Sequence, residues 1–244
     1  MKKPLIVLTG PTAAGKTHLS IALAKAVNGE IISADSMQVY KYMDIGSAKI
    51  RPEEMQGVPH HLVDCLEPDE EFNVVRFQQM AKEAMKGIYD RGRIPVLVGG
   101  TGFYIQAVTG DIDFTVHGED TTYRQMLEEK AKTEGAQVLH EMLAAVDPAS
   151  AAAIHANNVK RVIRALEYYR QTGKPISQHN EEQRQKESPY NLAYFVLNDE
   201  RTRLYERIDA RIDQMLADGL IDEVKTLKKM GYHKGMVSMQ GLGY

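Results

Sequence analysis

This chain of 244 residues has one cysteine, Cys65, and no tryptophan. A lone thiol excludes a disulfide framework and a multi-cysteine zinc site, and it favours a reducing compartment. Long apolar runs are also absent: the first one, Leu5 to Leu8, is too short for a membrane span or a signal-peptide core, and no later run is long enough. We therefore expect a soluble, cytoplasmic protein that does not associate with membranes.

An overall excess of basic charge is absent as well. The net charge is −3, from 30 basic and 33 acidic residues, which argues against a generally basic nucleic-acid binder. The charge is uneven, because residues 159–211 carry more basic than acidic side chains and the remainder is acidic. A polyanion could bind this basic region alone, although a solvated helix surface would have the same composition.

Strands and helices alternate in both terminal parts of the chain. Apolar runs typical of buried parallel strands occur at 5–8 and 94–98. Residues 30–35, which end on an acid, and residues 192–197 are also predicted as strands. Apolar residues at helical spacing occur at 17–27, 73–91, 103–108 and 202–230. This alternation predicts an α/β fold with a P-loop NTPase-like parallel sheet as its core.

The middle of the chain contains helices without a strand candidate. Helical patterns follow one another from about residue 121 to 173, and residues 179–188 are polar, which predicts a mobile loop. We therefore expect residues 1–117 and 189–244 to form the α/β core and residues 118–188 to form a helical insertion domain.

The strongest motif is a P-loop between the first predicted strand and helix. It comprises Gly10, Pro11, Thr12, Ala13, Ala14, Gly15, Lys16 and Thr17. In this context the backbone amides and the helix N-terminus can surround phosphate oxygens. Lys16 neutralises phosphate charge, and the Thr17 hydroxyl can hold Mg²⁺. The motif predicts a bound di- or triphosphate without specifying which bond is broken.

An acidic residue stands beside this predicted phosphate site. The strand at 94–98 ends in a glycine-rich turn around Thr101 without the acid that NTP hydrolases usually carry there. Asp35 instead ends the strand that follows the P-loop helix, and parallel strands end at the edge where ligands bind. We expect Asp35 to act as a general base or to orient a metal, with a turn cap formed by Asp35 and Ser36 as the alternative.

Other polar clusters carry less information. His60 and His61 are adjacent in an extended segment, where side chains point to opposite faces, so they make a poor metal chelate. Arg161 and Arg164 lie one helical turn apart on one face. Arg203, Arg207 and Arg211 have i, i+4 spacing with acids interleaved, and a salt-bridged structural helix is the alternative there.

Several segments together resemble the bacterial tRNA dimethylallyltransferase family. They are GPTAAGKT at 10–17, ISADSMQVYKYMDIGSAK at 32–49, GVPHHLVD at 57–64, GGTGFYIQA at 99–107, NNVKRVIRALEYYRQTGKP at 157–175 and RTRLYERIDARIDQMLADGLIDEV at 201–224. They span almost the whole chain in the family's order. Members of the family continue beyond the GLGY segment at 241–244, so we expect this chain to be truncated. The match is loose at 116–120.

The resemblance implies a prenyl transfer from dimethylallyl diphosphate to the exocyclic amine of the adenosine 3′ of the anticodon, with diphosphate as leaving group. Lys16, the loop amides and Mg²⁺ held by Thr17 would stabilise the departing charge. Asp35 would accept the proton of the attacking amine, with Thr101 beside it. The resemblance assigns Arg201 to the diphosphate, with Arg203 as the substitute.

The same resemblance implies where tRNA binds. The target base would leave its stack and enter the turn formed by Asp35, Ser36, Met37 and Gln38, next to Thr101. The insertion would hold the anticodon stem-loop by phosphate contacts. The residues expected there are Arg124, Lys160, Arg161, Val162, Ile163 and Arg164. We expect the enzyme to act as a monomer.

Two other functions remain open on the residues alone. A P-loop kinase for a small molecule or nucleotide would use the same phosphate cradle with ATP as donor. A nucleotide-driven switch or RNA-binding ATPase needs an acid at the end of the strand at 94–98 or a guanine-reading motif, and the sequence has neither.

Overall fold

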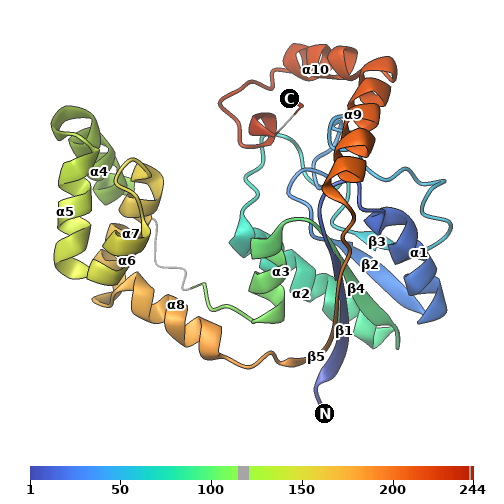
Figure 1. Cartoon of the computed structure of the whole chain (residues 1–244), viewed down its shortest axis with the longest axis horizontal. Helices are drawn as coiled ribbons and strands as arrows, with labels where there is room; N and C mark the ends of the chain where they lie inside the picture. Colours follow the sequence, from blue (N-terminus) through green and yellow to red (C-terminus); the bar gives the residue numbers. More distant parts are fainter. Residues whose placement is uncertain (115–120, 242) are drawn as a thin grey trace. The chain divides into compact units, whose positions relative to one another are not determined.

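A five-stranded parallel sheet organises the terminal parts of the chain (Figure 1). The structure is a computed structural model that describes residues 1–114, 121–241 and 243–244. The strand order is β3-β2-β4-β1-β5. The strands are β1 (Lys3–Thr9), β2 (Gly29–Ser33), β3 (His60–His61), β4 (Ile94–Gly99) and β5 (Tyr190–Val196). The predicted α/β fold is therefore confirmed, and β3 is a short edge strand that the sequence analysis missed.

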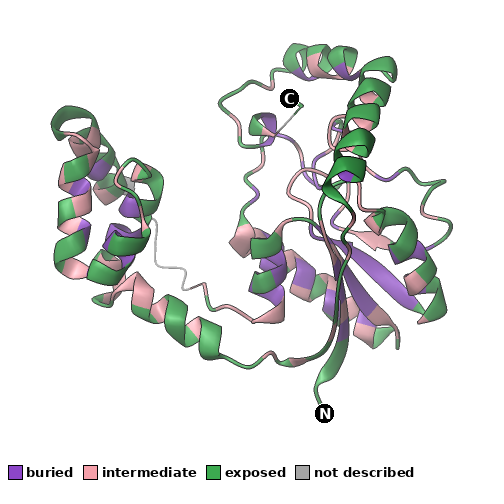
Figure 2. Ribbon diagram, viewed as in Figure 1, coloured by how far each residue is buried: buried purple, intermediate pink, exposed green. Residues whose placement is uncertain are grey.

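Helices pack on both faces of this sheet, and successive residues of the central strands face opposite cores. Ile32 and Leu97 belong to a core with α2 (Val74–Asp90) and α3 (Gly102–Thr109). Their neighbours Ile31 and Val96 lie in a second core with α1 (Lys16–Ala26). Both faces of the central strands are thus buried (Figure 2), which explains why they are continuously apolar.

The helical pattern predicted at 202–230 is confirmed, but it is divided between two helices. The structure has two helices, α9 (Arg201–Ala217) and α10 (Leu220–Lys229). Gly219 separates them with φ of 101°, a left-handed conformation that ends the helical path. A short 3₁₀ turn, η1 (Ser238–Gln240), follows α10.

The structure divides into two units, Met1–Ile112 with Ser188–Tyr244, and Asp113–Glu187. We predicted boundaries between residues 117 and 118 and between 188 and 189; the first lies outside the described residues. The second unit contains only helices in its described part. They are α4 (Thr121–Glu134), α5 (Ala136–Val146), α6 (Pro148–Ala153), α7 (Val159–Thr172) and α8 (Ile176–Gln185). Leu127, Leu139 and Leu143 belong to its separate hydrophobic core.

The predicted mobile loop at 179–188 is wrong, because most of it belongs to α8. No residue of α8 is buried, so the apolar periodicity that reveals a helix is missing. Side-chain pairs one turn apart support it instead, such as Gln178 with Glu182. Ser177 anchors its start by donating to Asp147. Throughout the described ranges, no helix is long and apolar enough to span a bilayer.

Candidate active site

The P-loop connects β1 to α1, as the sequence predicts. The ammonium group of Lys16 folds back over the loop and donates hydrogen bonds to the carbonyl oxygens of Gly10 and Pro11, at 2.9 and 2.7 Å. Burial lowers the pKa of Lys16, the nearby Asp35 carboxylate opposes this shift, and Arg211 adds to it. Lys16, Asp35 and Arg211 are therefore close enough for their charges to interact.

Asp35 lies just beyond the end of β2 and begins a tight turn. Its Oδ1 atom accepts hydrogen bonds from the backbone amides of Met37 and Gln38, at 2.8 and 3.2 Å. The expected cap is therefore present, but it uses only one oxygen of the carboxylate. The half-buried side chain thus keeps Oδ2 for a second partner.

The glycine-rich turn after β4 brings Thr101 to the same place. A Cβ atom at Gly99 would lie 2.2 Å from the carbonyl oxygen of Ala34, so only glycine allows β4 to end against the end of β2. The amide of Thr101 donates to that carbonyl at 3.3 Å. Thr101 precedes α3, and its side chain makes no capping hydrogen bond. Because Asp35 directly follows Ala34, this bond brings the backbone of Thr101 close to that of Asp35.

The first arginine of α9 is turned toward its own helix. The guanidinium of Arg201, expected at the diphosphate, donates to the Tyr205 hydroxyl at 2.9 Å and stacks over that ring. Arg203, the substitute, pairs with Asp199 and Glu200 at 3.8 and 3.5 Å. Neither contact involves the P-loop.

Two later arginines of α9 are associated with the P-loop instead. Arg207 donates to the carbonyl oxygen of Ala13 at 3.2 Å and to Asp199 at 2.6 Å. The charge of Arg211, one turn further along, lowers the pKa of the Lys16 amine. The i, i+4 spacing of these arginines was the available signal, but the interleaved acids also allowed a purely structural helix.

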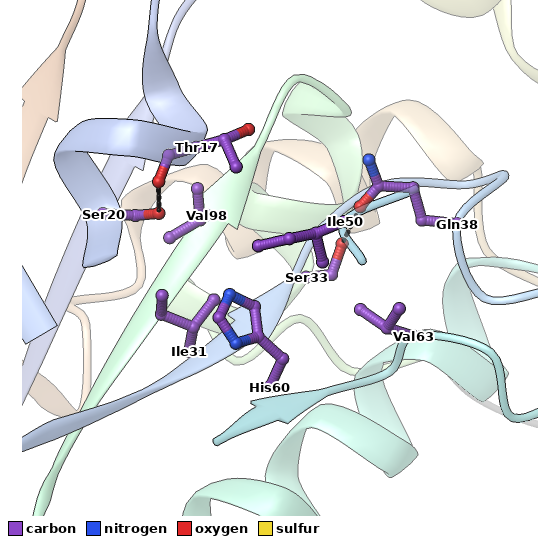
Figure 3. A pocket seen from close by; sticks show the side chains of 9 residues that line it. All are labelled: Thr17, Ser20, Ile31, Ser33, Gln38, Ile50, His60, Val63 and Val98. Atoms are coloured by element: carbon purple, nitrogen blue, oxygen red, sulfur yellow. Dashed lines mark hydrogen bonds between the residues drawn. The ribbon is translucent and has the colours of Figure 1, made fainter. Parts of the chain in front are cut away.

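A cavity of about 40 Å³ lies beside the P-loop helix (Figure 3). Four apolar side chains line it, together with polar ones. Its lining residues are Thr17, Ser20, Ile31, Ser33, Gln38, Ile50, His60, Val63 and Val98. A hydrogen bond of 3.3 Å from the Ser33 hydroxyl to Gln38 lies along one side. The P-loop helix and the turn that begins at Asp35 therefore share one pocket.

The two histidines of β3 point apart, as predicted. His60 lines the cavity and contacts the carbonyl oxygen of Val58 at 2.8 Å, and burial lowers its pKa. His61 contacts Glu30 at 2.7 Å. No group of three or more metal-binding side chains occurs in the part of the chain that the structure describes.

In the helical unit, α7 separates the expected tRNA contacts into exposed and buried residues. Lys160, Arg161 and Arg164 are exposed, and none of the described acids pairs with them. Val162 and Ile163 are 0% and 4% exposed and belong to the core of the unit. Their side chains occupy the inner face of the same helix and therefore cannot contact tRNA as the sequence analysis expected.

Arg124 has a structural partner in the same unit. Its guanidinium donates two hydrogen bonds to the carboxylate of Glu167, at 2.9 and 2.7 Å. Glu167 is only 6% exposed, so the pair joins α4 to α7. About half of the Arg124 side chain is still exposed.

Comparisons with known proteins assign the chain to a family. The model of the IPP transferase family matches residues 38–244, and that of the isopentenyl transferase family matches residues 3–65. The tRNA dimethylallyltransferase of Lachnoclostridium phytofermentans is 65% identical over 242 residues, which cover 99% of this chain and 77% of the relative. The chain belongs to the IPP transferase family.

Solved structures of the IPP transferase family share the fold. The full-length tRNA isopentenylpyrophosphate transferase of Bacillus halodurans is 48% identical, with a TM-score of 0.70, and the match covers 100% of this chain and 75% of that one. A eukaryotic dimethylallyltransferase acting on tRNA has a TM-score of 0.81 at 34% identity, with 93% and 56% covered. This chain thus spans about three quarters of its bacterial relatives.

Proposed function

We propose that this chain transfers a dimethylallyl group from dimethylallyl diphosphate to the exocyclic amine of the adenosine 3′ of the anticodon in tRNA. The carrying observation is that Asp35 lies near enough to the P-loop lysine to oppose the lowering of its pKa by burial, and that it directly follows Ala34, whose carbonyl accepts a hydrogen bond from the Thr101 amide. A P-loop can bind the diphosphate, and a carboxylate next to it can receive the proton of an attacking amine. Family membership favours this reaction over phosphate transfer.

The P-loop would act on the leaving group. As the allylic C–O bond breaks, the electron pair stays on the diphosphate, and its negative charge grows. The Lys16 ammonium, which now bonds to Gly10 and Pro11, would exchange these carbonyls for diphosphate oxygens. Arg207 and Arg211 would add positive charge from α9, and we propose them in place of Arg201 and Arg203.

Asp35 would act on the acceptor. The amine nitrogen forms the new C–N bond, and its proton passes to Oδ2, the oxygen that the turn does not use. Thr101, whose side chain makes no capping hydrogen bond, would place its hydroxyl beside the same carboxylate. Ser36, Met37 and Gln38 would form the turn on which the flipped base rests.

Mg²⁺ is the proposed cofactor, with the Thr17 hydroxyl as its protein ligand. Thr17 is exposed at the start of α1 and lines the cavity. Mg²⁺ commonly takes few protein ligands, with substrate phosphates and water completing its shell, so the sparse donor set fits. When bound, the ion supplies charge neutralisation at the diphosphate.

The helical unit would hold the tRNA. Lys160, Arg161 and Arg164 present exposed, unpaired charge, as phosphate contacts require. Arg124 could add to this surface only with the exposed part of its side chain, because Glu167 holds its guanidinium. We further propose that the protein is cytoplasmic and that it works as a monomer. Size-exclusion chromatography at micromolar concentration would check the oligomeric state.

The direct test offers two labelled donors to the same enzyme. Radiolabelled dimethylallyl diphosphate and γ-labelled ATP are incubated separately with enzyme, Mg²⁺ and unmodified tRNA. The proposal expects label in tRNA from the first donor alone. Phosphate transfer from ATP to any acceptor, without prenyl transfer, would make the chain a P-loop kinase instead.

A further inference from the structure

Glu223 lies in the first turn of α10 and has no part in the mechanism above. Its carboxylate accepts hydrogen bonds from three consecutive backbone amides, those of Asp44, Ile45 and Gly46, at 2.9, 2.8 and 3.1 Å. Such a run of amides forms a concave site for an anion. Among the described residues no lysine or arginine pairs with Glu223, so the amides are its main polar partners.

Tyr244 completes the surroundings of this carboxylate. Its hydroxyl donates to Oε1 of Glu223 at 2.5 Å, and its ring packs on Gly46, where a Cβ atom would collide with it. Burial, followed by the bond to Glu223, raises the pKa of Tyr244. The phenol therefore stays protonated and remains a donor at neutral pH.

The segment that Glu223 holds is connected to the active-site turn. The carbonyl oxygens of Ser47 and Ala48 accept hydrogen bonds from the side-chain amide of Gln38, at 3.5 and 3.1 Å. The backbone amide of Gln38 in turn donates to Oδ1 of Asp35 at 3.2 Å. Hydrogen bonds and the backbone of residues 44–48 thus connect Glu223 on α10 to Asp35.

We propose that Glu223 is a positioning residue for the acceptor half of the reaction. By fixing residues 44–46 it sets the carbonyls that orient Gln38, and through Gln38 it holds the turn that presents Asp35. This inference rests on the proposed function, since Asp35 must meet the acceptor amine. The hydrogen bonds of Glu223 within the described part of the chain do not involve the P-loop, so diphosphate binding should not depend on it.

The test compares Glu223→Gln with a neighbouring control, Asp222→Asn. The glutamine keeps the size of the side chain but turns an NH₂ group toward amide donors. Asp222 is an exposed acid of the same helix, and its side chain pairs with Lys225 alone among the described residues. For Glu223→Gln we expect kcat/KM for tRNA to fall on the order of tenfold, the equivalent of one charge-assisted hydrogen bond. The calorimetric Kd for inorganic diphosphate should stay within about twofold.

Amide hydrogen exchange gives a readout that does not need activity. Glu223→Gln should accelerate exchange at residues 44–46 and also at Met37 and Gln38, whereas Asp222→Asn should change neither. Faster exchange at 44–46 alone, or an unchanged kcat/KM, would overturn the proposal. So would an equal loss of diphosphate affinity, which indicates general damage.

Two further measurements distinguish a failure of this proposal from a folding defect and from a failure of the proposed function. If Glu223→Gln does not fold, Glu223→Asp keeps the charge on a shorter side chain, and it should show the same selective loss for tRNA. A wild-type enzyme that transfers no prenyl group would refute the proposed function. The exchange at Met37 and Gln38 would then still decide whether Glu223 controls this turn.

Discussion

In the proposed reaction the carboxylate of Asp35 would combine two tasks: one oxygen fixes the turn, and the other would take up the proton of the amine. Asp35→Asn separates them: the amide oxygen can still accept the two backbone bonds, but the side chain can no longer take up a proton. We expect kcat to fall by about 10²- to 10⁴-fold, with tRNA affinity nearly unchanged. Steady-state kinetics and tRNA binding by filter retention check this. A parallel loss of affinity would make Asp35 a binding residue.

Arginines on one helix differ in what they touch. The charge of Arg211 acts on the pKa of Lys16, whereas Arg201 is held over the Tyr205 ring. We expect Arg211→Ala to lower the transfer rate by about 10²- to 10³-fold, as Lys16→Ala should, because each removes a positive group at the growing charge. Arg201→Ala should leave the rate near the wild-type value, since its contact is exposed. The reverse ranking would restore the assignment that the sequence suggested.

The ionisation of Glu30 makes the free energy of unfolding depend on pH. Its carboxylate is 1% exposed and is held by Arg91, Arg93 and His61, and the Arg91 hydrogen bonds above all lower its pKa from 4.5 to about 2. Because the folded state favours the ionised Glu30, its lowered pKa adds to the free energy of unfolding. This contribution is fully present above pH 4.5, and it is lost as the pH falls through about 2. The shift corresponds to about 3 kcal/mol of unfolding free energy.

Glu30→Gln tests this linkage by urea unfolding at several pH values. We expect the variant to be less stable than the wild type at pH 7 and the difference to shrink as the medium becomes acidic. A difference that is independent of pH would show that Glu30 contributes through packing and not through its charge.

Elements whose stability comes from burial could be predicted from the sequence. Strands β1, β2 and β4 and helix α2 have clear apolar patterns because both sheet faces are covered, and the P-loop has a fixed spacing. Helix α8 could not be found this way, because polar side-chain pairs support it and no residue is buried. The two-residue strand β3 depends on pairing with β2, which no local pattern encodes.

The site residues also differ in whether a sequence pattern reveals them. Lys16, Asp35 and Thr101 could be brought together from the sequence, because they lie at the ends of parallel strands or at the P-loop. The arginines of α9 could not be ranked, since their roles depend on the direction in which the helix leaves β5. In α7, helical spacing places Val162 and Ile163 on the inner face, away from the basic side chains. The prediction that all of residues 160–164 bind tRNA did not take this spacing into account.

The outer face of α7 carries the next prediction. Arg161→Ala combined with Arg164→Ala should raise the Kd for tRNA and leave diphosphate binding unchanged. For each phosphate that the variant no longer neutralises, the slope of log Kd against log salt should become flatter by about 0.7 to 0.9. Binding titrations at several salt concentrations measure this slope. An unchanged slope would mean that α7 is only a solvated surface.

For the molecule as a whole, the proposed reaction would take its phosphate cradle and base from the α/β unit, and the helical unit presents an exposed cationic helix. The chain spans about three quarters of the length of its bacterial relatives. Prenyl transfer by this chain alone would therefore show that residues 1–244 contain the groups that the reaction needs.

The most direct measurement maps the product on the RNA. The chain is incubated with dimethylallyl diphosphate, Mg²⁺ and an unmodified tRNA transcript, and the digested RNA is analysed by mass spectrometry. We predict a single modified nucleotide, the adenosine 3′ of the anticodon, with the five-carbon group on its exocyclic nitrogen, and none with Lys16→Ala. A prenyl group at another nucleotide, or unmodified RNA alongside phosphate transferred from ATP, would contradict the account.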